Sequence, residues 1–412
     1  MRLVIACLAL PLLSAQTEGS AEALLTGIRV KMRDTLKRLP DYTCRLNIER
    51  SNGPEKSRRL HPVDTVHLEV GYVDGKELYA WPGQKFGAAG LEEMMPAGGA
   101  VGTGDFALHV RWIFLSNAAS FTYLGRSTAE GHETIQFGYR IPRAKSHYVL
   151  SSGPERRELV GYHGTFRVNA RTLLLERLEI VIDEIPQQLH IRRAGSMLTY
   201  AVTRIGEADF LLPHSSELYI VNSNGRESRN ITRFEQCRQY LGESVVSFAD
   251  PAPTSVEAPK TITDVHLPGG IRMEITLQTA LEGTRVAIGD PVKAVVSRDS
   301  VKAGKVVIPK GAKVTGRITR IGERNGGRVL YQVLGLQLSS VEFADHRAEF
   351  QGSLESLIFA AAQVTIASAP DPTRARPAAA WPSAGEGILF IKGNSLHIPA
   401  GAHMVWRTAN DE

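Results

Sequence analysis

The stretch Val306–Ile318 reads VVIPKGAKVTGRI, and its pattern returns at Leu396–Thr408 as LHIPAGAHMVWRT. A weaker third copy begins at His266, HLPGGIRMEI. Each copy places proline after an aliphatic residue and glycine two residues later. Proline fixes φ for a turn, and glycine lets the chain leave that turn at positive φ. The repeat therefore predicts a β-rich unit in which tight turns deliver the chain into strands.

Residues 261–412 surround this repeat and are predicted to form a small β-barrel or sandwich. Residues 369–387 are rich in proline and alanine, which predicts a mobile loop inside the unit. Short alternating segments predict its strands at Ile271–Leu277, Val292–Val296, Lys305–Ile308, Ala312–Ile321, Tyr331–Leu338, Val341–Phe343, Glu349–Leu354, Gly387–Ile391 and Leu396–Arg407. Residues 249–260, ADPAPTSVEAPK, precede this unit. They are rich in proline, alanine and serine, which predicts a linker.

Residues 16–248 are predicted to form a first domain. Apolar residues at helical spacing predict helices at Ala21–Leu39, which Pro40 ends, and at Phe106–Leu115. The remainder predicts an antiparallel meander with strands at Tyr42–Arg50, Thr65–Tyr72, Lys76–Trp81, Phe121–Arg126, Glu133–Arg140, Ser146–Ser151, Gly161–Asn169, Leu173–Ile182, Leu189–Ala194, Met197–Ile205, Phe210–Val221 and Glu227–Tyr240. The predicted fold class is therefore mainly β with a few helices: an α+β first domain with a curved antiparallel sheet, then the small β-unit.

The N-terminus has the features of a secretory signal peptide over residues 1–15. Arg2 is followed by an apolar stretch, Leu3–Leu13, and small residues precede a cleavage point near Ala15–Gln16. No later stretch has about 18 apolar residues, so no transmembrane segment is expected after cleavage. The protein is therefore predicted to be exported, to the periplasm or outside the cell.

Cleavage would leave two cysteines, Cys44 and Cys237. An even number in an exported chain favours a disulfide, and two separate buried thiols are the alternative.

The composition gives no sign of nucleic-acid binding. The formal net charge is +5, and the densest basic cluster is only Lys56, Arg58 and Arg59. No nucleic-acid partner is predicted.

The first domain resembles periplasmic lipoprotein carriers of the LolA/LolB type. The resemblance lies in the order of elements, a helix at Ala21–Leu39 followed by a long meander. It also lies in the strand pairs around Gly164–Ile182 and in Tyr200–Leu212, YAVTRIGEADFLL, which ends at Pro213. It implies a half-barrel whose concave apolar surface can hold acyl chains. A lipid or lipoprotein ligand is the partner it implies.

The second domain is similar in local pattern to the C-terminal β-domain of TrbI-type envelope proteins of secretion systems. The matching residues are Leu267–Gly270, Gly289–Val295 and Val306–Arg317. The chain lacks that family's membrane anchor and proline-rich arm. The resemblance implies a docking or assembly module with an envelope-protein partner.

Metal chemistry is not predicted. His132-Glu133 begins a metalloprotease-like HExxH, but Gln136 stands at the second ligand position and the segment is predicted as a strand. His61 and His67 are interpreted as an ordinary histidine pair rather than as ligands. We therefore expect no metal site.

Cofactor and nucleophile motifs are also missing from the sequence. It contains neither GxSxG nor SxxK. Gly102-Thr103-Gly104 with Ala107 matches GxGxxA, but no hydrophobic strand leads into it, so no cofactor is predicted. Carboxylates such as Glu92-Glu93, Asp183-Glu184 and Glu217 leave a hydrolase as a third hypothesis.

Aromatic residues crowd into one part of the first domain and suggest binding. From them we select Trp81, Phe86, Trp112 and Phe114 as candidate ligand-binding residues, with an ordinary core between sheet and helices as the alternative. The leading hypothesis is a non-enzymatic envelope protein that holds a lipid-like or apolar ligand in its first domain and docks through its second. A structural or assembly protein without a ligand is the main alternative.

Overall fold

The computed structural model describes residues 12–87, 90–95, 108–153, 156–240, 262–283, 285–325, 329–358, 364–366 and 385–409. The predicted linker, 249–260, lies outside these residues. So does the predicted signal peptide, 1–15, except for its last four positions, which are helical. Two large sheets make up the described chain. One ends at Gln239 and the other begins at Thr263, and we call them the N-terminal and C-terminal units.

The N-terminal unit is a curved antiparallel sheet of ten strands in the order β3-β2-β1-β12-β11-β10-β9-β8-β5-β4. Buried and exposed residues alternate along most of these strands, which turns one face of the sheet to the core. The strands are β1 (Tyr42–Pro54), β2 (His61–Val73), β3 (Lys76–Ala80), β4 (Ser120–Ala129), β5 (His132–Ile141), β8 (Gly161–Asn169), β9 (Leu175–Asp183), β10 (Ile191–Ile205), β11 (Ala208–Asn222) and β12 (Arg226–Gln239). The short strands β6 (Val149–Ser151) and β7 (Arg157–Leu159) pair separately.

Several helices and helical turns accompany this sheet. The long helix α1 spans Leu12–Lys37, so it begins nine residues before the predicted start at Ala21 and ends two before the predicted end at Leu39. The others are α2 (Leu91–Met94), α3 (Leu108–Val110), the π-helical turn η1 (Arg111–Leu115) and the 3-10 turns η2 (Arg143–Lys145) and η3 (Gln187–Leu189). The predicted helix at Phe106–Leu115 is thus present in its described part as α3 and η1.

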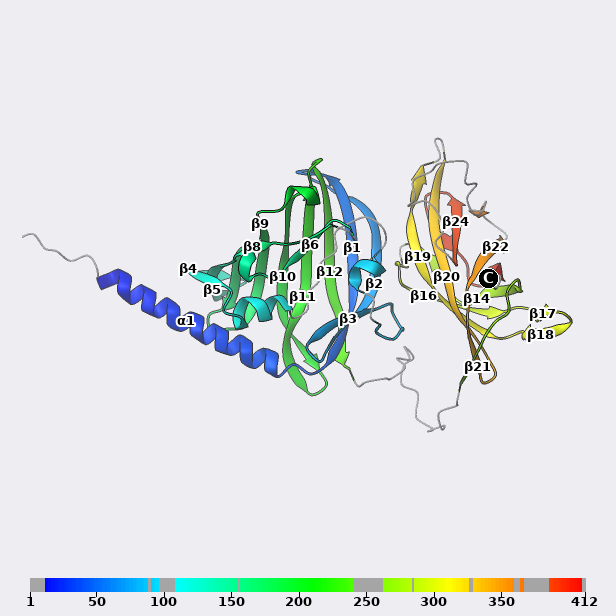
Figure 1. Ribbon diagram of the computed structural model, residues 1–412, viewed down its shortest axis with the longest axis horizontal. Helices are drawn as coiled ribbons and strands as arrows, with labels where there is room; N and C mark the ends of the chain where they lie inside the picture. Colours follow the sequence, from blue (N-terminus) through cyan, green and yellow to red (C-terminus); the bar gives the residue numbers. More distant parts are fainter. Residues whose placement is uncertain are drawn as a thin grey trace, which may run out of the picture.

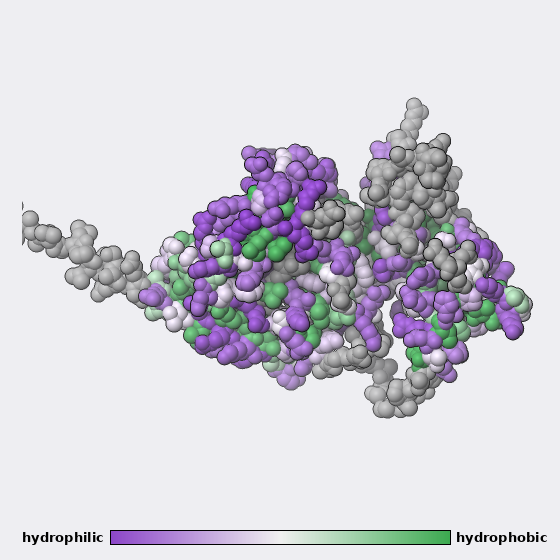
Figure 2. Space-filling model, in the orientation of Figure 1, coloured by the Kyte–Doolittle hydropathy of each residue, from purple (hydrophilic) through white to green (hydrophobic). Residues whose placement is uncertain are grey.

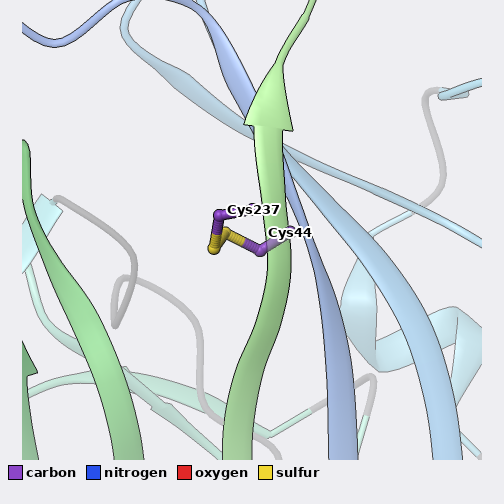
Figure 3. The surroundings of a disulfide bond; sticks show 2 residues. All are labelled: Cys44 and Cys237. Atoms are coloured by element: carbon purple, nitrogen blue, oxygen red, sulfur yellow. A yellow bond between two sulfur atoms is a disulfide. The ribbon is translucent and has the colours of Figure 1, made fainter. Parts of the chain in front are cut away.

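Cys44 and Cys237 form the predicted disulfide (Figure 3). It joins the neighbouring strands β1 and β12 at the point where their register shifts, between Thr43 and Arg45. β1 and β12 are the first and last strands of this sheet along the sequence, so the bond ties the beginning of the unit to its end across 193 residues of chain.

The C-terminal unit is a second sheet, in the order β13-β21-β20-β19-β16-β14-β26-β22, with β24 added to β20 and β23 to β24. It curls until its ends meet, because a Cβ at Gly387 in β24 would lie 2.5 Å from the Cβ of Leu354 in β22. Its strands are β13 (Thr263–Val265), β14 (Arg272–Leu277), β16 (Pro291–Val296), β19 (Lys313–Asn325), β20 (Leu330–Phe343), β21 (His346–Glu349), β22 (Gly352–Ile358), β23 (Val364–Ile366), β24 (Glu386–Lys392) and β26 (His403–Thr408). Two small pairs, β15 (Leu281–Glu282) with β25 (His397–Ile398) and β17 (Ser300–Lys302) with β18 (Lys305–Ile308), complete it.

The prediction of a mobile loop at 369–387 is wrong at its C-terminal end, where two of these residues belong to a strand. Glu386 and Gly387 belong to β24 and are buried, because they pair with Gln337 and Leu336 of β20. The rest of that loop, up to residue 384, lies outside the described residues.

The repeated proline–glycine turns have equivalent environments. Gly311 (φ +86°) donates its N–H to the carbonyl of Val296 at the end of β16, and Gly401 (φ +85°) donates to Leu277 at the end of β14. Gly270 in the third copy also has positive φ, +74°. The turns that the repeat predicts are therefore confirmed, and two of them bond the last residues of neighbouring strands of the same sheet.

Candidate functional site

Helix α1 covers part of the concave face of the first sheet, and its N-terminal end projects beyond the sheet (Figure 1). Ile28 and Met32, one helical turn apart, are 0% and 1% exposed. Both belong to the hydrophobic core that the sheet forms with η1. On the face shown in Figure 2 the apolar residues form separate patches among hydrophilic ones, because the main apolar surfaces are turned inward.

A polar contact fastens α1 to the short helical segment beside it. Nε of Arg29 donates to the carbonyl of Phe114, at 2.9 Å, and Nη2 donates to Oδ1 of Asn117, at 3.2 Å. Ser116 ends η1 between these two residues, where its backbone N–H bonds the carbonyl of Arg111. One arginine therefore holds α1 against the C-terminal end of η1.

A cavity lies where the second half of α1 meets the sheet. The volume in which the centre of a water molecule can move is about 20 Å³. It has room for one or two water molecules and is far too small for an acyl chain. Its lining is apolar apart from two hydroxyl groups, and consists of Met32, Thr35, Leu36, Leu39, Val110, Leu175, Tyr200, Leu211 and Pro213.

Phenylalanine rings fill the core on the η1 side of this cavity. Phe114, 0% exposed, packs edge-on against Phe166 with ring centroids 4.8 Å apart. Phe137 stacks on Phe166 at 5.5 Å, and Phe121 closes the group from β4. These rings leave a hydrophobic surface beneath α1 and η1 that carries no charge.

Buried tyrosines form the other half of this surface. Tyr139 and Tyr162 meet with ring centroids 6.2 Å apart, and Tyr148 packs on Tyr162 and stacks on His109. Burial raises the pKa of Tyr42 and of Tyr139 well above the usual value near 10, and it also raises the pKa of Tyr162. Tyr139 and Tyr162 are therefore neutral hydrogen-bonding groups of this surface at physiological pH, whereas Tyr42 belongs to the separate core that contains Val66.

The four aromatic residues selected from the sequence each have different neighbours. Phe114 is in the phenylalanine core. Trp112 is 37% exposed and stacks on His147, with ring centroids 3.7 Å apart. Phe86 packs over Gly71, and Trp81 lies against Arg317 of the C-terminal unit. None of the four lines the cavity beneath α1, and their role in binding stays a prediction.

The cavity-lining residues come instead from α1 and the residues just after it, from α3 and from strands β9 to β11. The selection of aromatic residues missed them because most are aliphatic. One signal was present in the sequence, since Tyr200 and Leu211 belong to the stretch that carries the resemblance to lipoprotein carriers and Pro213 directly follows it. In the structure β10 and β11 are paired neighbours, which places both ends of that stretch at the cavity.

The residues considered for other chemistry have ordinary partners. His132 begins strand β5, one residue before the predicted strand at Glu133–Arg140, and its Nε2 lies 2.5 Å from Oε1 of Glu176. Asp183 lies 2.6 Å from Nδ1 of His163 and also pairs with Arg140. Across the described ranges, no group of three or more His, Cys, Asp and Glu residues is arranged to hold a metal ion. No helix in the same ranges is long and apolar enough to cross a membrane.

Comparison with known proteins gives only distant structural similarities. No protein-family model and no curated protein matches the chain. A LolA superfamily protein from Nitrosomonas europaea is 9% identical, with a TM-score of 0.29, over 52% of this chain and 93% of its own. A DUF1329 family protein from Desulfovibrio piger is 13% identical, with a TM-score of 0.28, over 54% and 94%. MucB in its complex with MucA is 10% identical, with a TM-score of 0.19, over 92% and 99%. TM-scores this low establish neither a ligand nor a partner.

Proposed function

We propose that the N-terminal unit binds an apolar, lipid-like molecule between α1 and the concave face of its sheet, in a non-enzymatic protein exported to the cell envelope. The signal-like N-terminus and the Cys44–Cys237 disulfide support export. The site that we assign lies beneath α1 and includes Phe114, rather than the four selected aromatic residues as a group.

One observation carries the proposal: α1 meets the sheet through an uncharged surface that already encloses a cavity. The C-terminal end of the helix leads through Pro40 into the first strand, and Arg29 supplies a polar fastening to η1. A small outward movement of α1 would enlarge the cavity between Leu36 on the helix and Leu211 on the sheet. An apolar ligand would then replace helix–sheet contacts with contacts of the same kind, at little cost in free energy.

Two variants of the same helix test this site. Leu36→Glu places a carboxylate in the lining of the cavity, whereas Val30→Glu places one on the outer side of α1, where Val30 is 40% exposed. A fluorescent fatty acid titrated into the full-length mature protein is expected to bind the wild type and the Val30 variant. Binding by the Leu36 variant is expected to fall at least about tenfold, because a carboxylate cannot be buried beside an acyl chain. Circular dichroism checks that both variants remain folded.

Native mass spectrometry of the protein purified from its own envelope supplies a second measurement. A co-purifying acyl-containing molecule, released on denaturation, supports the proposal and identifies the ligand. A ligand-free mass together with equal fatty-acid binding by both variants would exclude the site.

A second candidate function is an assembly protein without a ligand, and two observations favour it. The cavity is small in this conformation, so the core beneath α1 is nearly filled. In addition, the β17–β18 hairpin of the C-terminal unit projects from its sheet (Figure 1) and presents Val301 and Val306 as a cross-strand pair, 53% and 54% exposed. A stable complex with an envelope protein that is lost in the Val301→Lys, Val306→Lys variant, with no bound lipid, would establish this alternative.

A further inference from the structure

The edge of the first sheet at β2 is completed by a turn from the C-terminal unit. Strand β3 pairs only with Glu69–Val73, so the first half of β2 has no strand of its own unit on the outer side among the described residues. The backbone of Ile288 occupies this position. Its carbonyl accepts from the N–H of His67, at 2.8 Å, and its N–H donates to the carbonyl of Thr65, at 2.9 Å.

The same turn is bonded on its other side to the second sheet. Asp290 N–H donates to the carbonyl of Ala287, which closes a β-turn over residues 287–290. Gly289 N–H donates to the carbonyl of Ile318, and the carbonyl of Asp290 accepts from the N–H of Ile318. Backbone hydrogen bonds therefore run from β2 through the turn to β19, where the two units meet.

Gly289 is required by this packing. Its φ of +96° suits the third position of such a turn. A Cβ on this residue would lie 2.3 Å from the carbonyl oxygen of His67 and 2.6 Å from the ring of Trp81. No side chain fits between the turn and the N-terminal unit.

The side chains on either side of Gly289 fit complementary groups of the N-terminal unit. Ile288 is 1% exposed and packs in the core that contains Val66. The carboxylate of Asp290 lies 2.6 Å from Nδ1 of His67 and 3.3 Å from Nη2 of Arg45, and its second oxygen accepts from the N–H of Ala287. The N-terminal unit therefore provides an aliphatic pocket for Ile288, a space with no room for a side chain at Gly289, and a basic pair for Asp290. These three features follow the order of the residues in the turn.

Another contact closes over the turn. The guanidinium of Arg317 lies 5.0 Å from the centre of the Trp81 ring, a cation–π contact between the two units. The ring of Trp81 therefore packs beside Gly289 and also contacts Arg317, so two residues of the C-terminal unit lie against it. This gives Trp81 a contact within the protein that its sequence position did not predict.

We propose that this surface, formed by Arg45, Thr65, Val66, His67 and Trp81, is a recognition site for a turn of the form aliphatic–Gly–Asp. In this chain the C-terminal unit supplies the turn, as Ile288-Gly289-Asp290, and thereby locks the two units into one body. The site binds the turn through its own contacts and does not depend on the covalent connection. The same turn presented by a separate molecule therefore competes for it.

Cleavage of the connection tests the proposal in the full-length protein. A protease recognition sequence is inserted between residues 249 and 260 and cut after purification. The two fragments are expected to remain together in size-exclusion chromatography and native mass spectrometry. A complex of two copies of each fragment also supports the site, with the turn then supplied by a second molecule. Complete separation of the wild-type fragments at micromolar concentration would overturn the proposal.

A pair of glycine variants gives the matched control. Gly289→Ala and Gly311→Ala both place alanine at positive φ, +96° and +86°, but a Cβ at Gly311 meets nothing within 4 Å. Only Gly289→Ala is expected to separate the fragments. In the uncleaved chain it is also expected to split thermal unfolding into two transitions, whereas Gly311→Ala keeps one. Equal behaviour of the two variants in both measurements would contradict the proposal.

Competition shows whether the site accepts a turn from outside. A cyclic peptide containing VAIGDP, the sequence of residues 286–291, is expected to displace the C-terminal fragment from the cleaved protein. The same peptide with valine in place of glycine is expected to have no effect. Displacement by neither peptide at millimolar concentration would show that the turn is not recognised in isolation.

Discussion

The hydroxyl of Tyr139 reaches across Gly164 and donates a hydrogen bond to the backbone carbonyl of Glu179, at 2.7 Å. Tyr139 and Gly164 are cross-strand neighbours on β5 and β8, and Glu179 lies on the next strand, β9. One side chain thus connects three strands beneath the helical cover. This arrangement is possible only because the residue between the two partners has no side chain.

Gly164→Ala is therefore expected to destabilise the protein strongly. A Cβ at this position would lie 1.9 Å from the carbonyl oxygen of Glu179, a distance that the backbone must relieve by moving. We expect the free energy of unfolding to fall by about 3 kcal/mol, the upper end of the usual range for overpacking. Urea unfolding measures the change. Gly322→Ala is the control within a strand, since a Cβ there meets nothing within 4 Å, and should change stability by less than about 1 kcal/mol.

The buried tyrosines predict a loss of stability at alkaline pH. Burial disfavours the charged tyrosinate and so raises the pKa of Tyr42 and Tyr139 in the folded protein. Above about pH 10 the unfolded chain releases tyrosine protons that the folded chain retains, which favours unfolding as the pH rises. The stabilisation is complete below pH 10 and is lost progressively above it.

Urea unfolding between pH 9 and pH 11 checks this dependence. The Tyr42→Phe, Tyr139→Phe double variant should be less stable than the wild type at pH 9, because the Glu179 carbonyl loses its donor, by about 1–3 kcal/mol for that bond. Its stability should also fall less steeply with pH, since two titrating groups are gone. A wild-type profile that stays flat to pH 11 would contradict the assignment.

A buried ion pair between β1 and β2 predicts a large effect of one carboxylate. Arg50 and Asp64 form two hydrogen bonds of 2.6 Å, and their side chains are 4% and 5% exposed. Asp64→Ala removes the carboxylate and leaves the guanidinium charge in the core, which should cost about 3–5 kcal/mol of unfolding free energy. Asp209→Ala at the Arg204–Asp209 pair, 58% exposed on both sides, should cost less than about 1 kcal/mol. Similar losses in the two variants would contradict this difference.

The sequence predicts local structure well in this protein and the site poorly. Proline and glycine at fixed spacing define a turn by backbone sterics alone, so the turns at Gly311 and Gly401 follow from the sequence. The disulfide follows from the count of cysteines in an exported chain. The mainly β fold class follows from short alternating segments, and the sheets confirm it.

The position of the aromatic residues does not follow from the sequence, for a topological reason. Trp81 and Phe86 follow β3, and Trp112 and Phe114 precede β4, so the four are near one another in the sequence. Yet β3 and β4 are the two opposite edges of the same sheet. Strand order is set by long-range pairing, above all of β1 with β12, and no local pattern reports it. The contacts of the turn at Gly289 were missed for the same reason, since its partners in the N-terminal unit lie more than two hundred residues earlier in the chain.

Thr35 gives a final prediction at the candidate site itself. Its hydroxyl is buried in the lining of the cavity and has no hydrogen-bond partner among the described residues. Thr35→Val keeps the shape and removes the hydroxyl, so the free energy of unfolding should rise by about 1 kcal/mol. Thr199→Val is the matched control, because Oγ1 of Thr199 bonds Oγ of Ser215 at 2.7 Å, and that variant should be less stable than the wild type.

Binding measurements test whether the Thr35 hydroxyl contacts the ligand. In that case Thr35→Val weakens fatty-acid binding, whereas Thr35→Ser preserves it. Opposite signs for the two valine variants in urea unfolding would show that the unpaired hydroxyl is retained at a cost in stability, as expected of a binding site. A loss of stability in Thr35→Val equal to that in Thr199→Val would show that the hydroxyl is part of the fold.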